Sequence, residues 1–230
     1  LDSDQERALQ DGLDPYFKWH KSTIMPRIAD SVSALAQAAE KGQCATLFDK
    51  QQALWNNLYR DTIEKMTPII AGVLSTLDAE QHEELAEGMQ ADLEKAYKRI
   101  ESPEKRTEKF VSRMEGFLGD LTDKQREFLR WRDPVGQKHE ELRMTCRVTY
   151  QQKLVQALKA KQSAKQIEAI LNGWWTQEGC SAAFLKHRNT MRQSWRTRMT
   201  QFEKSLDAEQ RSSLVEELTT FKNNIRSILN

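Results

Sequence analysis

The sequence predicts an all-α protein made of two tandem repeats of one long-helix unit. Three observations favour this class: few helix-breaking residues, a large share of charged residues, and a short motif that occurs four times. The 230 residues include only nine Gly and five Pro, 30% of them are charged and 38% are hydrophobic. This balance is typical of long amphipathic helices and argues against a β-sandwich or a doubly wound α/β sheet.

The recurring motif is Leu-[Asp/Thr]-x-x-Gln, with another leucine four positions after the Gln. Its Asp or Thr can cap the first turn of a helix, while the Gln reaches back to the cap and the leucines enclose the entering chain. We therefore interpret the motifs mainly as structural caps. The motifs run from Leu1 to Gln5, from Leu77 to Gln81, from Leu121 to Gln125 and from Leu206 to Gln210, and only the third has Thr (Thr122) where the others have Asp.

The spacing of the motifs indicates an internal duplication. The first and second start 76 residues apart, the third and fourth 85, and the two pairs are separated by 44. Residues 54–81 also align without a gap on 183–210, and apolar residues recur at matching positions. The sequence thus predicts two domains, a first helical repeat at 1–120 and a second at 121–230.

The two predicted repeats carry opposite charge. Residues 1–120 have 15 Lys and Arg against 22 Asp and Glu, whereas residues 121–230 have 20 against 12. A basic second repeat can attract an anionic partner or pair with the acidic first repeat, and charge alone does not choose between them.

Capping residues and apolar periodicity place the individual helices. After a short helix at the N-terminus, we expect helices at about 15–41, 46–75, 78–101, 103–118, 122–131, 134–161, 163–172, 180–205 and 207–229. Pro26 and Pro68 should bend or break their helices. Gly119, Gly173 and Gly179 should mark joints between elements.

Paired Leu-Thr-x-x-Gln motifs about eighty residues apart in a helical chain resemble the Spy/CpxP family of bacterial periplasmic stress proteins, which includes ATP-independent chaperones. Two such units in tandem, with Trp19-His20 before Pro26-Arg27 and the junction Gly119-Asp120-Leu121-Thr122, also resemble an uncharacterised family of bacterial envelope lipoproteins. The first resemblance implies an elongated or cradle-shaped fold in which a duplicated chain takes the place of two subunits. The second covers nearly the whole chain and implies location and architecture.

A cationic segment is the main candidate for partner binding. Residues 186–198 hold five Lys and Arg and no acid. Arg188, Arg192 and Arg196 are spaced four apart and share one helix face, and Arg143 and Arg147 can form a similar row on a neighbouring helix. These rows face anionic clients or lipid headgroups, or else the acidic first repeat. Nucleic acid is a poor candidate because the overall charge is near neutral and no binding motif is present.

Aromatic residues add two further candidates. Trp174 and Trp175 are adjacent, so both cannot point inward from one helix face; one of them can serve as an exposed binding anchor, and packing of both is the alternative. An apolar stripe at helical spacing should instead form core. Its members are Phe184, Met191, Trp195, Met199 and Phe202.

The sequence contains few residues arranged for metal binding or catalysis. Its three cysteines are too widely spaced for a zinc site, and the four histidines are scattered, so we expect neither a metal nor a cofactor. We favour a disulfide between Cys146 and Cys180, with three reduced thiols as the alternative. Only His139 with Glu140 and Glu141 resembles acid–base machinery, and a solvated helix face explains that cluster better. We therefore expect a protein that is not an enzyme.

These inferences together predict a periplasmic, ATP-independent chaperone-like protein. It would bind unfolded or partly folded envelope proteins on an amphipathic, Arg-rich helical surface. The alternative is a lipoprotein adaptor or regulator that binds one folded envelope partner, and a purely architectural role is a third. The chain has no apolar run near eighteen residues, which excludes a membrane span. It starts at Leu1 without Met, a start compatible with the removal of a signal peptide or a lipid-anchor segment, so the expected location is the periplasm, with an outer-membrane lipoprotein as one form of it.

Overall fold

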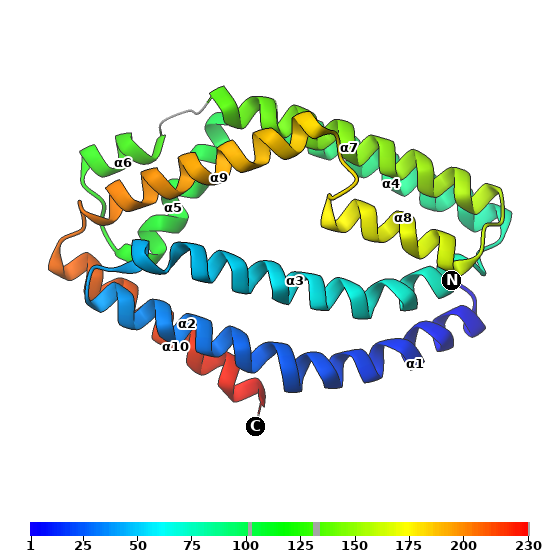
Figure 1. The fold of residues 1–230 in the computed structure, drawn as a ribbon, viewed down its shortest axis with the longest axis horizontal. Helices are drawn as coiled ribbons and strands as arrows, with labels where there is room; N and C mark the ends of the chain where they lie inside the picture. The colour runs from blue at the N-terminus through cyan, green and yellow to red at the C-terminus, as the bar shows by residue number, and fades with distance from the viewer. Residues whose placement is uncertain (101–102, 131–133, 230) are drawn as a thin grey trace. The chain divides into compact units, whose positions relative to one another are not determined.

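A computed structural model of the 230-residue chain describes residues 1–100, 103–130 and 134–229 (Figure 1). All regular structure in these ranges is helical. The all-α class is therefore confirmed. Within the same ranges, no helix combines the length and the apolar character needed to cross a membrane.

The helices lie close to the predicted ranges. They are α1 (Ser3–Trp19), the π-helical turn η1 (His20–Ile24), α2 (Met25–Glu40), α3 (Cys44–Leu74), α4 (Ala79–Ile100), α5 (Pro103–Leu118), α6 (Asp123–Arg130), α7 (Pro134–Lys159), α8 (Ala164–Thr176), α9 (Ala182–Glu203) and α10 (Ala208–Leu229).

The prolines interrupt the helices less than predicted. Pro15 lies inside α1, so the expected helix start there is wrong. Pro68 lies inside α3 and does not break it, so of the expected bend or break only the bend stays a prediction. Pro26 does coincide with an irregularity: η1 precedes it, and Pro26 occupies the first turn of α2, where a missing N–H costs no hydrogen bond.

The chain forms two compact units, which we call unit 1 and unit 2. Unit 1 consists of residues 1–19, 58–101 and 135–189, and unit 2 of residues 20–57, 102–134 and 190–230. These units differ from the predicted division at residue 120. The physical reason is helix length: α3 has 31 residues and is about 46 Å long, so one helix contributes to both units, and α9 is divided in the same way.

Each unit combines segments of both sequence repeats. Unit 1 contains both motifs of the first repeat and a long segment of the second; unit 2 contains both motifs of the second repeat and a long segment of the first. Unit 1 therefore carries 16 Lys and Arg against 19 Asp and Glu, and unit 2 carries 19 against 15. The charge imbalance of the two repeats is thus largely offset within each unit.

In unit 1 the two motif glutamines form a reciprocal pair. Gln5 Oε1 accepts a hydrogen bond from the backbone N–H of Asp2 (2.9 Å), and Gln81 Oε1 accepts one from Asp78 (3.0 Å). The Nε2 of Gln5 donates to Gln81 Oε1 (3.0 Å), and the Nε2 of Gln81 donates to Gln5 Oε1 (2.8 Å). The pair therefore joins the starts of α1 and α4.

The same arrangement recurs in unit 2. Gln125 and Gln210 exchange two hydrogen bonds of 2.9 Å, and their Oε1 atoms accept from the backbone N–H groups of Thr122 (2.9 Å) and Asp207 (3.2 Å). In addition, Gln210 Nε2 donates to the carbonyl of Asp120 (2.8 Å). Each motif thus caps a helix and also contacts its partner motif.

The motif leucines are less uniform. Leu121 is buried, and Leu206 packs partly buried against the same cluster of unit 2. Leu77 is half-buried, and Leu1 is exposed. The expected enclosure by leucines therefore fails at the first motif, where Leu1 exposes 57% of its surface.

The predicted apolar stripe is core at its ends only. Phe184 is completely buried in unit 1, and Phe202 is buried in unit 2 beside the half-buried Met199. Trp195, also in unit 2, exposes 42% of its surface and contacts Phe110 edge-on, so its prediction as core is wrong. Elsewhere in unit 2, α2 and α10 lie side by side (Figure 1).

Candidate functional site

The predicted arginine rows are split between the units. Arg143 bonds Glu140 within α7 (2.7 Å), Arg147 is half-buried, and Arg188 lies 5.8 Å from the ring centre of Phe184; all three belong to unit 1. Arg192 and Arg196 belong to unit 2. The five side chains therefore do not form one surface within either unit.

Several basic residues of the second repeat pair with acids of the first. In unit 1, Lys159 contacts Glu83 at 2.8 Å. In unit 2, Arg196 contacts Asp49 at 2.8 Å. These contacts favour the interpretation in which the basic repeat offsets the acidic one. They do not involve Arg192, which is half-buried on α9.

Trp174 and Trp175 are packed rather than exposed. Both are half-buried at the C-terminal end of α8 and lie against a cluster of unit 1 that includes Leu154 and Leu171. The backbone carbonyl of Trp175 accepts a hydrogen bond from Tyr59 Oη at 2.9 Å. Of the two sequence interpretations, packing is therefore the one that the geometry favours.

Cys146 and Cys180 form the disulfide that the sequence favoured, between α7 and the segment before α9. The neighbouring Tyr150 is buried against two glycines. A Cβ at Gly173 would lie 2.6 Å from Tyr150 Oη, and one at Gly179 would lie 1.8 Å from it. Gly173 lies inside α8 and is therefore not the predicted joint; both glycines leave room for the tyrosine.

His139 is held by packing. Its ring stacks on Phe184 at 5.0 Å between centroids, and burial lowers its pKa, helped by the positive charges of Arg143, His187 and Arg188 and opposed by Glu140. Glu140 and Glu141, which the sequence grouped with His139, instead bond Arg143 and Lys138. Among the described residues, no group of three His, Cys, Asp or Glu side chains has a metal-binding arrangement.

A concave site lies in unit 2. It is a cavity of about 310 Å³, within the range of ligand pockets. It opens between α2, the first turns of α3 and the last turns of α9. Its walls are mostly apolar, and the lining residues are Leu35, Cys44, Ala45, Phe48, Gln51, Gln52, Trp55, Arg196, Met199, Thr200 and Glu203.

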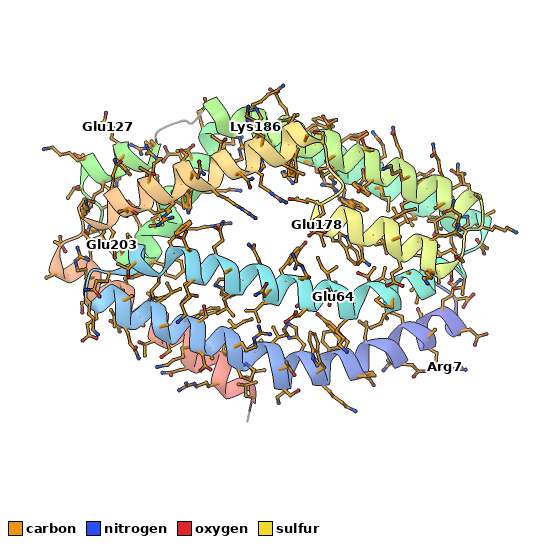
Figure 2. The ribbon with its side chains drawn as sticks, viewed as in Figure 1. Arg7, Glu64, Glu127, Glu178, Lys186 and Glu203 are labelled. Carbon is orange, nitrogen blue, oxygen red and sulfur yellow. A yellow bond between two sulfur atoms is a disulfide. The ribbon has the colours of Figure 1, made fainter. Side chains whose placement is uncertain are left out.

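Glu203, labelled in Figure 2, positions one wall of the cavity. Its carboxylate accepts hydrogen bonds from the backbone N–H groups of Cys44 (2.5 Å) and Ala45 (3.0 Å), the first two residues of α3. A carboxylate at this place satisfies donors that have no partner inside the helix and offsets the positive end of the helix dipole. The last turn of α9 is thereby attached to the start of α3.

Cys44 is a half-buried thiol in this wall. Burial raises its pKa to about 12, with further contributions from the charge and the hydrogen bond of Glu203. The thiol is therefore protonated at neutral pH, so Cys44 contributes an uncharged, weakly polar surface.

Two polar groups at the cavity keep hydrogen-bonding capacity. Arg196 uses only Nη1 for Asp49, which leaves its other N–H donors available. Gln52 is half-buried, and among the described residues its side-chain amide has no protein hydrogen-bond partner. Gln51, by contrast, bonds Ser31 through both its Oε1 and its Nε2.

Residues 1–178 match the model of a protein family described as a family of unknown function, DUF6279. The chain belongs to the DUF6279 family. The match covers more than three quarters of the chain and includes the α2 and α3 walls of the cavity, whereas the α9 wall lies beyond it. Comparison of this DUF6279 protein with curated proteins gave no match, and comparison with solved structures gave none either.

Sequence reasoning missed the cavity of this DUF6279 protein. The alignment of residues 54–81 on 183–210 places Trp55 opposite Phe184 at a shared apolar position, yet Phe184 is completely buried and Trp55 exposes 40% of its surface. The alignment could not predict this difference in exposure, because Trp55 and Phe184 lie in different units and have different neighbours. The bonds of Glu203 to α3 span about 160 residues and have no local sequence signature.

Proposed function

We propose that this protein is a periplasmic, ATP-independent, chaperone-like protein that binds unfolded or partly folded envelope proteins. The observation that carries the proposal is the open, mostly apolar cavity of unit 2 next to Arg196. Aromatic side chains are exposed in the same unit: Trp55, which lines the cavity, exposes 40%, and Trp195 on α9 exposes 42%. Apolar surface beside cations is suited to segments that a folding protein has not yet buried.

Two features support the compartment and the kinship. A buried disulfide is typical of proteins that fold in an oxidising compartment such as the periplasm. The reciprocal glutamine pairs, repeated in both units, support the proposed relation to the Spy/CpxP proteins, because paired motifs were the basis of that resemblance. A lipid anchor, and with it an outer-membrane location, remains part of the proposal.

Suppression of aggregation tests the proposal. Heat-denatured citrate synthase should scatter less light when an equimolar amount of the full chain is present, without nucleotide. Raising the salt concentration should weaken the effect only partly, because apolar contact persists when charges are screened. No suppression at either salt concentration contradicts the proposal.

A pair of variants localises the activity. Trp55→Ser should reduce suppression, whereas Phe117→Ser removes a similarly exposed aromatic residue of unit 2 that does not line the cavity and should leave suppression unchanged.

Pull-down from envelope extract separates this function from that of an adaptor. Many weakly retained proteins support the chaperone, and a single stoichiometric folded partner contradicts it.

A further inference from the structure

The size of the unit 2 cavity suits one ring and its attachment. Its volume is about 310 Å³, and an apolar cavity of about 150 Å³ is enough to bind benzene. The cavity is also open, since Trp55 on its wall exposes 40% of its surface. A group that remains linked to a longer chain can therefore enter it.

The walls favour an aromatic occupant over an aliphatic one. Phe48 and Trp55 on α3 present rings, and Met199 on α9 presents a thioether. Rings pack favourably against other rings in edge-on or offset geometry, and methionine sulfur makes favourable contacts with aromatic groups.

Charges around the cavity are already balanced. Arg196 is paired with Asp49, and Glu203 is bound by the N-terminal N–H groups of α3. A charged occupant would lose its water without gaining an unpaired counter-ion, which is costly. The cavity therefore favours an uncharged group.

The hydrogen-bonding groups at the cavity that have no partner among the described residues match those of a peptide group. The amide of Gln52 offers both a donor and an acceptor, and Arg196 retains donors beyond Nη1. A peptide unit likewise offers one N–H and one carbonyl. A hydrocarbon occupant would form no hydrogen bond with either group.

We propose that the cavity holds an aromatic side chain of a bound polypeptide, with the ring against Phe48, Trp55 and Met199 and the adjoining peptide group at Gln52 and Arg196. This inference rests on the proposed chaperone function. It adds that aromatic residues are the points at which a client chain is held.

Filling the cavity tests the inference. The client is fluorescein-labelled, reduced and carboxymethylated α-lactalbumin, which stays unfolded, and binding to the full-length protein is followed by fluorescence anisotropy. Ala45→Phe, which adds a ring to a lining residue, should weaken binding at least about fivefold. Ala53→Phe is the matched control on an exposed position of α3 and should bind like the wild type.

A second pair guards against a misfolded variant. Thr200→Phe fills the cavity from α9, and Thr197→Phe is its control on an exposed position of the same helix. Circular dichroism and thermal melting establish which variants fold. If the folded filling variants bind the client as tightly as their controls do, the inference is overturned.

Three small probes test the chemistry of the occupant. They share a phenylpropyl body and differ in the end group: 4-phenylbutanamide is neutral, 4-phenylbutanoate is an anion and 4-phenylbutylamine is a cation. Only the amide should displace the labelled client efficiently, with roughly tenfold weaker competition by the charged probes. Gln52→Leu should reduce that preference, whereas Gln37→Leu, on an exposed position of α2, should not.

The outcomes separate this inference from the proposed function. If the wild type binds no client, the proposed function fails. If no client binds but 4-phenylbutanamide gives saturation-transfer NMR signals that Ala45→Phe abolishes, the cavity binds free aromatic molecules. The assignment of the cavity to client side chains is then overturned. Client binding that is insensitive to the amide and to the filling variants overturns the inference and leaves the proposed function in place.

Discussion

Units 1 and 2 each contain a pair of hydrogen-bonded glutamines, but the two units hold their remaining segments together by different interactions. In unit 1 the segment before α9 is attached by the Cys146–Cys180 disulfide and packs Gly179 on Tyr150. In unit 2 the start of α3 is attached by the carboxylate of Glu203, and a cavity remains beside it. The shared motif fixes where helices begin, and the rest of each unit is free to diverge.

The contrast extends to the cysteines. Unit 1 holds two in a covalent bond, whereas the single cysteine of unit 2, Cys44, is a protonated thiol in the cavity wall. The disulfide fixes two segments of unit 1 covalently, whereas hydrogen bonds join α3 and α9 at the cavity wall of unit 2.

The largest expected effect is the loss of the disulfide. Replacing both Cys146 and Cys180 with Ser should lower the free energy of unfolding by about 4 kcal/mol, because the bond closes a loop of 34 residues that the unfolded chain would otherwise explore. Guanidinium titration measures the total. Hydrogen exchange resolved by peptide should show the loss of protection mainly in residues 135–189.

The matched control is Cys44→Ser in unit 2, which removes no covalent bond and should change the free energy of unfolding by less than about 1 kcal/mol. Equal loss of protection in both units after removal of the disulfide would contradict the difference between them, because the link would then stabilise the chain as a whole.

The next effect comes from Tyr150. Gly179→Ala should destabilise unit 1 by about 1–3 kcal/mol, because the new Cβ would lie 1.8 Å from the buried tyrosine's Oη. Gly88→Ala, in the exposed middle of α4, meets nothing within 4 Å and should instead stabilise the protein by about 0.5–1 kcal/mol. Thermal melting of both variants checks the opposite signs.

The helical class and most helix positions could be predicted because they depend on local properties. Capping by Asp207 and apolar periodicity act within a few turns, so α10 was placed within one residue of its observed ends. The division into units depends instead on which distant segments pack together. Nothing in the composition around residue 57, in the middle of α3, indicates that the chain passes there from one unit to the other.

The candidate site shows the same limit. The sequence identified Arg196 as a binding residue from its charge, but not Asp49 as its partner, because 147 residues separate them. It identified Gln81 as a cap but not as the partner of Gln5. The cavity arises where α2, α3 and α9 leave space, and such a space depends on side chains brought together only by the fold.

The glutamine pairs should differ in strength. The pair Gln125–Gln210 is buried on both sides, whereas Gln81 in the other pair is half-exposed. A double-mutant cycle with Leu substitutions should give a coupling of about 1–2 kcal/mol for the unit 2 pair, because a single replacement leaves a buried amide without its partner. The pair Gln5–Gln81 should give about half as much, since water reaches Gln81. Equal couplings would show that exposure does not distinguish the pairs.

The smallest expected effect is a pH dependence confined to unit 1. The pKa of His139 lies below its ordinary value of 6.5 in the folded state, mainly through burial against Phe184, so below that pH the unfolded chain binds more protons than the folded one. The stabilisation is complete above pH 6.5 and is lost as the pH falls through the folded-state pKa. Peptide-resolved hydrogen exchange, corrected for intrinsic rates, should show residues 135–189 losing protection between pH 7 and pH 5 while α10 changes less. His139→Phe keeps the ring stack, removes the titrating group and should flatten this difference; an unchanged profile would assign the pH dependence to other groups.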